Sequence, residues 1–196
     1  YILAWTTTPW TLPSNVALVV NANENYAKVK YNGEILIFAE ALVKTVLGED
    51  AEYEIIETFK GEQLQGTRYL PLFDFLENDP KGFYVVTDDY VTLTDGTGVV
   101  HTAPAFGEDD ARVGHKYDLP FRQYVNNQGT MTEEVKPWVG LFVKDTDKPI
   151  IEYLEKTGAL FKAVKFEHSY PFCWRCDTPL IYYARDTWFI KMTALR

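Results

Sequence analysis

Three adjacent threonines near the start of the chain are the first residues whose types could serve chemistry. Thr6, Thr7 and Thr8 precede Pro9, and the residue before a proline avoids the helical conformation, so we expect this segment to be extended. Hydroxyls on an extended segment can donate and accept hydrogen bonds, which suits contact with a ribose, a phosphate or a positioned water. A threonine-rich strand that leads into a turn is the plainer interpretation, because threonine favours strands in any case.

A second group of candidate residues follows a glycine turn in the middle of the chain. Residues 95–110 run from a short apolar strand through a Pro-Gly loop into an acidic helix start, a path that presents side chains to a cleft. His101 can act as acid, base or hydrogen-bond partner near neutral pH, and Asp110 is a strong acceptor for an ammonium group. The plainer interpretations are a packed histidine for His101 and helix-start electrostatics for Asp109 and Asp110.

The chain has two cysteines, Cys173 and Cys176, too few for a disulfide framework. Their two-residue spacing is typical of half a metal site, because a structural zinc takes four ligands. His168 could supply a third ligand, but we do not expect it to do so. Cysteine usage of this kind favours a reducing, cytoplasmic location.

The elements that must position these residues are many short strands and a few helices. Apolar and β-branched runs between turn signals predict strands over Val16–Val20, Ala27–Tyr31, Glu34–Phe38, Tyr53–Glu57, Phe83–Val86, Gly98–His101 and Ala163–Phe166. Asn32-Gly33 predicts a hairpin between two of them. Helical spacing and capping signals predict helices over Ala39–Leu47, Glu108–Tyr117 and Lys148–Thr157. This pattern favours the α+β class, with a mixed β-barrel-like domain surrounded by a few helices.

Composition and charge limit the partners of the chain. The net charge of −9 argues against a main nucleic-acid anchor, which normally has a basic face, although the end of a strand could be delivered by a neighbouring domain. No run of about 18 apolar residues is present, so we expect no membrane partner. A shift to aromatic residues near Phe166 predicts a domain over residues 1–166 and a tail over 167–196 that leaves it for a neighbour. The start lacks an initiator Met and opens in mid-pattern, so we expect an excised segment of a longer protein.

Three motifs in order resemble those of the editing domain that is inserted in the class I synthetases for isoleucine, valine and leucine. The first is Trp-Thr-Thr-Thr-Pro-Trp-Thr at 5–11, and the second is Gly-Thr-Gly-Val-Val-His-x-Ala-Pro-Ala at 96–105. The third, at 170–181, is similar to the segment that re-enters the synthetic domain. The isoleucine subtype fits best, because its relatives for valine and leucine usually carry Arg in place of Thr8 and another residue in place of His101.

The resemblance implies a role for each matched residue. Asp110 matches the acidic residue that receives the α-amino group of the misattached amino acid. His101 matches the residue that bounds the side-chain pocket and excludes isoleucine. Thr6–Thr8 match the stretch that lines the pocket and contacts the terminal adenosine or a water. Asn15 matches a polar residue near the same site, and Trp5 matches a neighbouring aromatic contact.

Phe106 and the two cysteines also bear on this resemblance. Phe106 stands where many relatives have His, which puts in doubt any role for a second imidazole. Cys173 and Cys176 resemble half of a four-cysteine zinc site whose other half lies upstream. Zinc could therefore bind them in the full-length protein, and we expect no zinc, or loosely bound metal, in this chain.

The implied reaction is editing, the hydrolysis of mischarged valyl-tRNA(Ile), with valyl-adenylate as a second candidate substrate. Isoleucine and valine differ by one methylene, worth only about 1–3 kcal/mol in a hydrophobic pocket, a limit for which the isoleucine synthetases are themselves the standard illustration. The implied partners are the 3′ end of aminoacylated tRNA(Ile), valine and the rest of the synthetase chain. Editing needs no cofactor, and ATP is used only by the synthetic domain, whose nucleotide signatures this chain lacks.

The mechanism and the function class retain alternatives. The chain offers no convincing nucleophile-and-base triad, so a water positioned by threonine hydroxyls and the terminal ribose is the preferred nucleophile. A rival mechanism makes His101 the general base. The alternative functions are the editing domain of a valyl- or leucyl-tRNA synthetase, a non-catalytic module that binds the tRNA end, and a structural module built around zinc.

Overall fold

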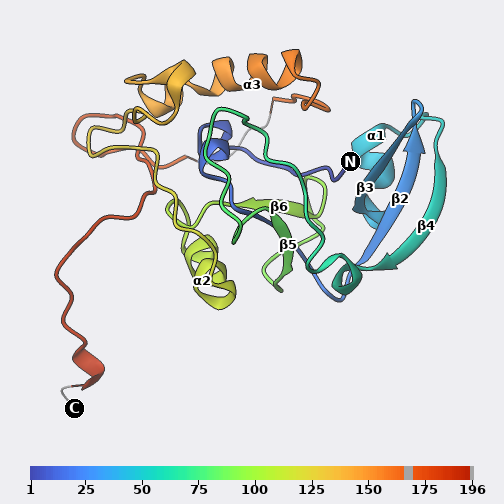
Figure 1. Cartoon of the computed structure of the whole chain (residues 1–196), viewed down its shortest axis with the longest axis horizontal. Coiled ribbons are helices and arrows are strands. Elements are labelled where there is room, and N and C mark those ends of the chain that lie inside the picture. The colour runs from blue at the N-terminus through green and yellow to red at the C-terminus, as the bar shows by residue number, and fades with distance from the viewer. Residues whose placement is uncertain (166–169, 195–196) are drawn as a thin grey trace.

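The computed structural model describes residues 1–165 and 170–194, and there six strands form two three-stranded sheets (Figure 1). In the first sheet, β1 (Ala17–Val20) lies between β5 (Tyr84–Thr87), which is parallel to it, and β6 (Val99–Thr102), which is antiparallel. In the second, β2 (Asn25–Tyr31) lies between β3 (Glu34–Ala39) and β4 (Glu54–Lys60), both antiparallel. The predicted α+β class is confirmed; the described strands form two separate small sheets rather than a closed barrel.

The central strand of the first sheet, β1, is apolar and buried at every position, which is the pattern of a strand whose sheet is covered on both faces. Leu18 and Val20 pack with Tyr26 of the second sheet in one core cluster. Ala17 and Val19 face the other way and pack against Val113 of helix α2 (Glu108–Tyr117). The sheet that carries His101 is therefore held between the second sheet and α2.

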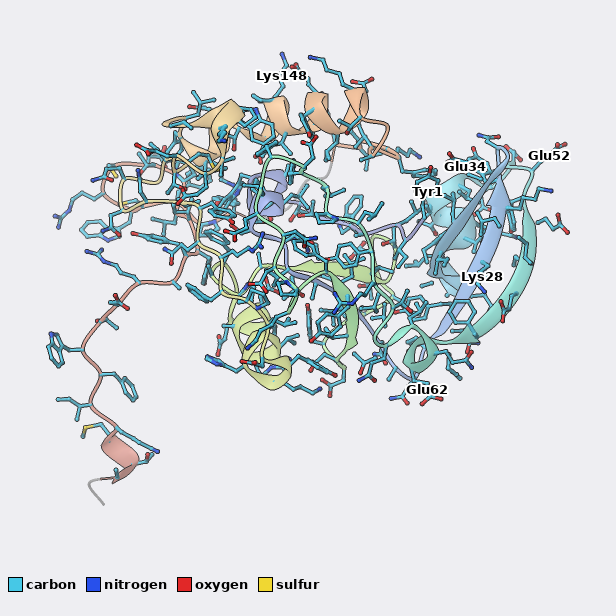
Figure 2. The ribbon with its side chains drawn as sticks, in the orientation of Figure 1. Tyr1, Lys28, Glu34, Glu52, Glu62 and Lys148 are labelled. Atoms are coloured by element: carbon cyan, nitrogen blue, oxygen red, sulfur yellow. The ribbon has the colours of Figure 1, made fainter. Side chains whose placement is uncertain are left out.

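The second sheet has the hairpin that the dipeptide Asn32-Gly33 predicts. Both residues have positive φ, 49° and 85°, which is the backbone that a two-residue hairpin turn requires. On the outer side of the sheet, Lys28 of β2 pairs with Glu57 of β4 at 2.6 Å. The side chains of Lys28 and Glu57 are 41% and 50% exposed, and Figure 2 shows Lys28 and Glu34 on this sheet. The outer side of the sheet therefore carries charged side chains that contact solvent.

The helices follow the predictions with one change. The segment predicted as one helix over 39–47 is divided into a 3₁₀ helix, Glu40–Leu42, and a short α1, Val43–Leu47. Helix α3 spans Asp147–Lys156. The other 3₁₀ helices are Pro9–Ser14, Gly61–Leu64, Lys136–Trp138, Val143–Asp145 and Met192–Ala194. Within the described residues, every helix is too short and too polar to cross a membrane.

The last predicted strand is wrong where it can be examined: residues 163–165 form no strand and are exposed, and Phe166 lies outside the described residues. With no neighbouring strand to pair, an apolar run alone does not make a strand.

The first part of the C-terminal segment contacts the body of the molecule, and the last part projects away from it. The Ala184 N–H donates to the Ala105 carbonyl at 2.6 Å, and Ile181 and Tyr183 pack against the largest core cluster. After Ala184 the chain projects away from the body (Figure 1), and Trp188 is fully exposed. The boundary at 166/167 lies outside the described residues and stays a prediction.

Candidate active site

The threonine segment is held in place by the 3₁₀ helix Pro9–Ser14 that follows it. Pro9 occupies the first turn of that helix, where its missing N–H costs nothing. The Trp10 N–H donates to the Asp147 carboxylate of α3 at 2.9 Å, which fixes the start of the 3₁₀ helix from a distant part of the chain. The preceding threonines are therefore presented at a defined position on the body.

A chain of hydroxyls runs from these threonines to His101. Thr6 Oγ1 lies 3.3 Å from Thr8 Oγ1 and accepts from the Thr8 N–H at 3.0 Å. Thr8 Oγ1 lies 3.2 Å from Thr11 Oγ1, which lies 3.0 Å from His101 Nε2. Thr7 is exposed, and its side chain makes no hydrogen bond to the described residues. Thr11 is the functional candidate that the sequence reasoning missed; its place in the motif after Pro9 was the only available signal.

His101 is a buried, neutral imidazole with one open nitrogen. It lies on β6 opposite Leu18 of β1, its residue is 8% exposed, and burial lowers its pKa to about 4. The Thr11 hydroxyl lies between the Thr8 carbonyl, at 2.8 Å, and His101 Nε2, at 3.0 Å. Among the described residues, the other ring nitrogen, Nδ1, has no hydrogen-bond partner.

Asp110 lies in the first turn of α2, where the helix dipole favours a negative charge. Its carboxylate is largely removed from water, and this burial raises its pKa to about 6. The hydrogen bond from the Ala103 N–H lowers the pKa, and the nearby charge of Asp109 adds to the rise. Its Oδ2 accepts from that N–H at 3.4 Å. A carboxylate has about four acceptor sites, so most of the acceptor capacity of Asp110 remains open to an ammonium group.

Trp5 and Asn15 are fixed by the fold in different ways. The Trp5 N–H donates to the Val99 carbonyl at 3.0 Å, and its indole lies against Gly96, where an added Cβ would come 2.5 Å from the Trp5 ring. Asn15 donates to the Ala17 carbonyl at 2.8 Å and accepts from the Tyr69 hydroxyl at 2.6 Å. The amide of Asn15 is therefore already engaged in holding β1 and the segment around Tyr69.

Most of the predicted site residues are attached to strand β6 or to Ala103, the residue that follows it. Thr6 and Thr8 reach His101 through Thr11, Trp5 forms a bridge to Val100, and Asp110 bonds to Ala103. No hydrogen bond within the described part of the chain joins Asp110 to His101 or to the threonines. A surface hollow of about 360 Å³ lies elsewhere, between residues 77–80 and 121–124, and contains none of the predicted site residues.

Phe106 belongs to the core rather than to a polar site. It is 8% exposed and packs edge-to-face on Trp10, with ring centroids 5.2 Å apart. The position is thus filled by an apolar ring that supports the 3₁₀ helix after the threonines.

The cysteine pair lies in a tight turn of the C-terminal segment. The Cys173 N–H donates to the Thr178 carbonyl at 2.8 Å, and the Asp177 N–H donates to the Cys173 carbonyl at 2.8 Å. Hydrogen bonds with Thr178, and then one with Cys173, lower the pKa of the Cys176 thiol. Two thiols on one turn suit half of a tetrahedral zinc site. The described residues contain no cluster of three or more metal-ligating side chains, and His168 lies outside them.

Comparison with known proteins adds relatives by sequence and by fold. No protein-family model matches the chain. All 196 residues align at 60% identity with the isoleucine–tRNA ligase of Clostridium acetobutylicum, and the whole chain aligns at 48% identity with that of Thermococcus kodakarensis. The chain spans about a fifth (19%) of the length of these curated relatives.

Solved structures agree on the fold. The crystal structure of GlLeuRS-CP1 matches with a TM-score of 0.63 at 15% identity, over 85% of each chain. The editing domain of the cytosolic leucyl-tRNA synthetase of P. knowlesi matches with a TM-score of 0.60 at 14% identity, over 93% of this chain and 83% of that one. At such low identity the match concerns the fold alone. Over its whole length the chain is thus similar in sequence to one segment of isoleucine–tRNA ligases, and it has the fold of the solved synthetase editing domains.

Proposed function

We propose that the chain hydrolyses valyl-tRNA(Ile), releasing valine from the 3′ end of the tRNA. The observation that carries the proposal is the arrangement around β6. A hydroxyl chain ending at a buried neutral His101 and the largely buried carboxylate of Asp110 are attached to the same end of this strand. Such an arrangement offers hydrogen-bonding groups for a ribose or water together with an anion for an ammonium group.

The nucleophile in this proposal is water. Its oxygen attacks the ester carbonyl carbon, the bond to the ribose oxygen breaks, the ribose hydroxyl regains a proton, and valine leaves as the free acid. Thr6 and Thr8 orient the water and the terminal nucleotide through their hydroxyls. An ester is already activated, so orientation of the attacking water supplies much of the acceleration. Valyl-adenylate, which is also an activated valine, is a second substrate by the same chemistry.

Selection of valine comes from two groups with different tasks. Asp110 binds the α-ammonium group, which every amino acid shares, and so anchors without choosing. His101 narrows the space for the side chain, and its fixed ring excludes the extra methylene of isoleucine. The hydrogen bond between the Thr11 hydroxyl and His101 Nε2 holds the imidazole ring in that orientation. A steric barrier is needed here because attraction alone discriminates poorly between aliphatic side chains that differ by one methylene.

The partners follow from the charge and the length of the chain. With a net charge of −9, the chain takes only the tRNA end, and the rest of the ligase holds the body of the tRNA. Cys173 and Cys176 would supply two thiolates to a zinc ion whose other ligands lie outside this chain. The reaction itself needs neither zinc nor ATP, and we place it in the cytoplasm.

Deacylation of valyl- and isoleucyl-tRNA(Ile) tests the proposal, first with this chain and then with the complete ligase that carries it. The wild type is expected to release valine and to leave isoleucine attached, and Asp110→Ala is expected to lose the reaction. Glu108→Ala is the matched control, because it removes an exposed carboxylate from the same helical turn. A wild-type ligase that hydrolyses neither ester, yet binds the tRNA end, would instead support a non-catalytic binding module.

A further inference from the structure

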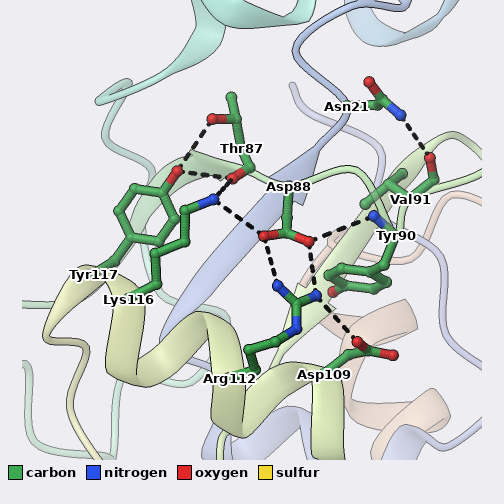
Figure 3. A network of polar contacts seen from close by, with 9 residues as sticks. All are labelled: Asn21, Thr87, Asp88, Tyr90, Val91, Asp109, Arg112, Lys116 and Tyr117. Atoms are coloured by element: carbon green, nitrogen blue, oxygen red, sulfur yellow. Dashed lines mark hydrogen bonds and ion pairs between the residues drawn. The ribbon is translucent and has the colours of Figure 1, made fainter.

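A buried carboxylate outside the proposed site joins β5 to the helix that carries Asp110. Asp88 follows β5, and its side chain is 2% exposed. Both of its oxygens accept from the Arg112 guanidinium, at 2.7 and 3.0 Å, and Lys116 donates to it at 3.1 Å (Figure 3). The Tyr90 N–H donates to the same carboxylate at 3.4 Å. The Arg112 hydrogen bonds, followed by Lys116, hold the pKa of Asp88 well below its ordinary value.

The geometry of this contact fixes direction as well as distance. Arg112 and Lys116 are four residues apart on α2, so they lie on one face of the helix, and both point to Asp88 (Figure 3). A two-bond contact between a guanidinium and a carboxylate allows little rotation. Asp88 is buried, whereas the side chains of Arg112 and Lys116 are 48% and 50% exposed. The contact is a weak source of stability, because desolvation of the carboxylate opposes the attraction and solvent screens the two cations. Orientation is therefore the property that this pair is best suited to supply.

The apolar contacts of α2 leave room for that role. Val113 packs on the β1 side of the sheet, and Gly114 lies against Pro104, where an added Cβ would approach to 2.9 Å. Apolar packing of this kind is non-directional, so it fixes the distance between α2 and its neighbours but favours no particular hydrogen-bond direction. Asp110 precedes Arg112 by two residues, so a rotation of the helix would move its carboxylate relative to β6.

We propose that Asp88 is a positioning residue for the editing reaction: through Arg112 and Lys116 it sets the rotation of α2, and so places the Asp110 carboxylate where the substrate ammonium group must bind. This inference rests on the proposed function, in which Asp110 is the ammonium anchor. Asp88 itself contacts no substrate. Its effect should therefore be confined to substrates that carry the ammonium group.

The test compares two esters in the complete ligase, valyl-tRNA(Ile) and the tRNA(Ile) ester of 2-hydroxyisovaleric acid, in which a hydroxyl replaces the ammonium group. Asp88→Asn keeps the shape of the side chain and removes its charge. A misplacement of about 1 Å can cost about a hundredfold in rate, so we expect kcat/KM for the valyl ester to fall by about ten- to a hundredfold. The hydroxy ester should change by less than about threefold by the same reasoning.

A second ion pair, at the residue that follows α2, supplies the control. Lys81 and Asp118 are joined at 2.6 Å, but their side chains are 65% and 87% exposed, so their mutual attraction is weak. Lys81→Met should leave both esters unaffected. Arg112→Lys, which keeps the charge but loses the two-bond geometry, should show part of the selective loss, and it also serves if Asp88→Asn does not fold.

Non-additivity gives the decisive comparison. If Asp88 acts through Asp110, then Asp88→Asn should cause no further loss for the valyl ester once Asp110→Ala is present. Equal losses on both esters, or losses that multiply in the double variant, would mean that Asp88 only stabilises the fold and would overturn the inference. If Asp110→Ala leaves valyl hydrolysis intact, the proposed function fails instead, because the ammonium anchor is then absent.

Discussion

Acidification from pH 7 to pH 5 should weaken editing in a way that identifies its anchor. Asp110 binds an ammonium group only when it is ionised, and its burial raises its pKa to about 6. With that pKa, about nine-tenths of the carboxylate is ionised at pH 7 and about one-tenth at pH 5. Because kcat/KM follows the free enzyme, we expect it to fall about tenfold over this interval.

Other ionisable groups of the reaction should not imitate this fall. His101 has its pKa lowered to about 4, so it stays neutral from pH 7 to pH 5. The α-amino group of the substrate has an ordinary pKa of about 8, so acidification completes its protonation and favours binding. The decrease should therefore follow the ionisation of Asp110 alone.

The assay measures initial deacylation rates of subsaturating valyl-tRNA(Ile) from pH 4.5 to 7.5, corrected for the uncatalysed reaction at each pH. Asp110→Asn keeps the size of the side chain but cannot ionise, so its residual rate should lack the inflection near pH 6. Glu108→Gln, with the change on an exposed residue of the same turn, should keep it.

Two outcomes would refute the reasoning. A rate that still rises at pH 4.5 and is level from about pH 5 upward would indicate that His101, with its pKa of about 4, is the titrating base, as the rival mechanism requires. A wild-type inflection near pH 6 that persists in Asp110→Asn would show that another group controls the rate, and the anchor would have to be sought elsewhere.

Three further predictions concern His101 and its neighbour. His101→Ala should still hydrolyse the valyl ester and should begin to hydrolyse isoleucyl-tRNA(Ile), because the steric barrier is gone; loss of all hydrolysis in that variant would make His101 the general base. Thr11→Val keeps the shape of the side chain but leaves His101 Nε2 without its partner at 3.0 Å, so urea unfolding should show a loss of about 1–3 kcal/mol, and an unchanged midpoint would contradict it. Because the pKa of His101 falls from 6.5 to about 4 on folding, the unfolded state binds the proton first, and stability should drop as pH falls from about 6.5 to about 4, by about 3 kcal/mol. Over part of this range protonation of Asp110 has the opposite effect on stability, because folding raises the pKa of Asp110. The difference in urea-derived stability between wild type and His101→Gln at each pH therefore isolates the contribution of the histidine. A difference that does not change with pH would count against the burial of His101 as a neutral group.

Local sequence pattern predicted most of the helices and strands, but it could not predict whether a candidate strand would find a partner. The apolar run of β1 and the dipeptide Asn32-Gly33 act through contacts within a few residues, so their structure was predictable. Residues 163–165, the described part of another predicted strand, form no strand. A strand also needs a partner, and the partner is a property of the whole chain.

The candidate site divides in the same way. Residue types and motif order were enough to select Thr6, Thr8, His101 and Asp110, and their resemblance to an editing domain agrees with the relatives in sequence and with the fold. Their roles remain predictions, because the types alone do not determine burial or hydrogen bonding. Burial makes His101 a neutral group and raises the pKa of Asp110, and no local pattern specifies how much water a side chain will lose.

Only the tertiary structure could bring together residues that are far apart in the sequence. Thr11 and His101 are separated by 90 residues, and Asp88 and Arg112 by 24. Each partner alone has an ordinary interpretation, as a turn threonine or as a surface arginine. Their meeting depends on how two sheets and α2 pack, which is the sum of many non-directional apolar contacts. The sequence by itself determined which side chains could do the chemistry; the packing decided which of them touch and which charges are buried.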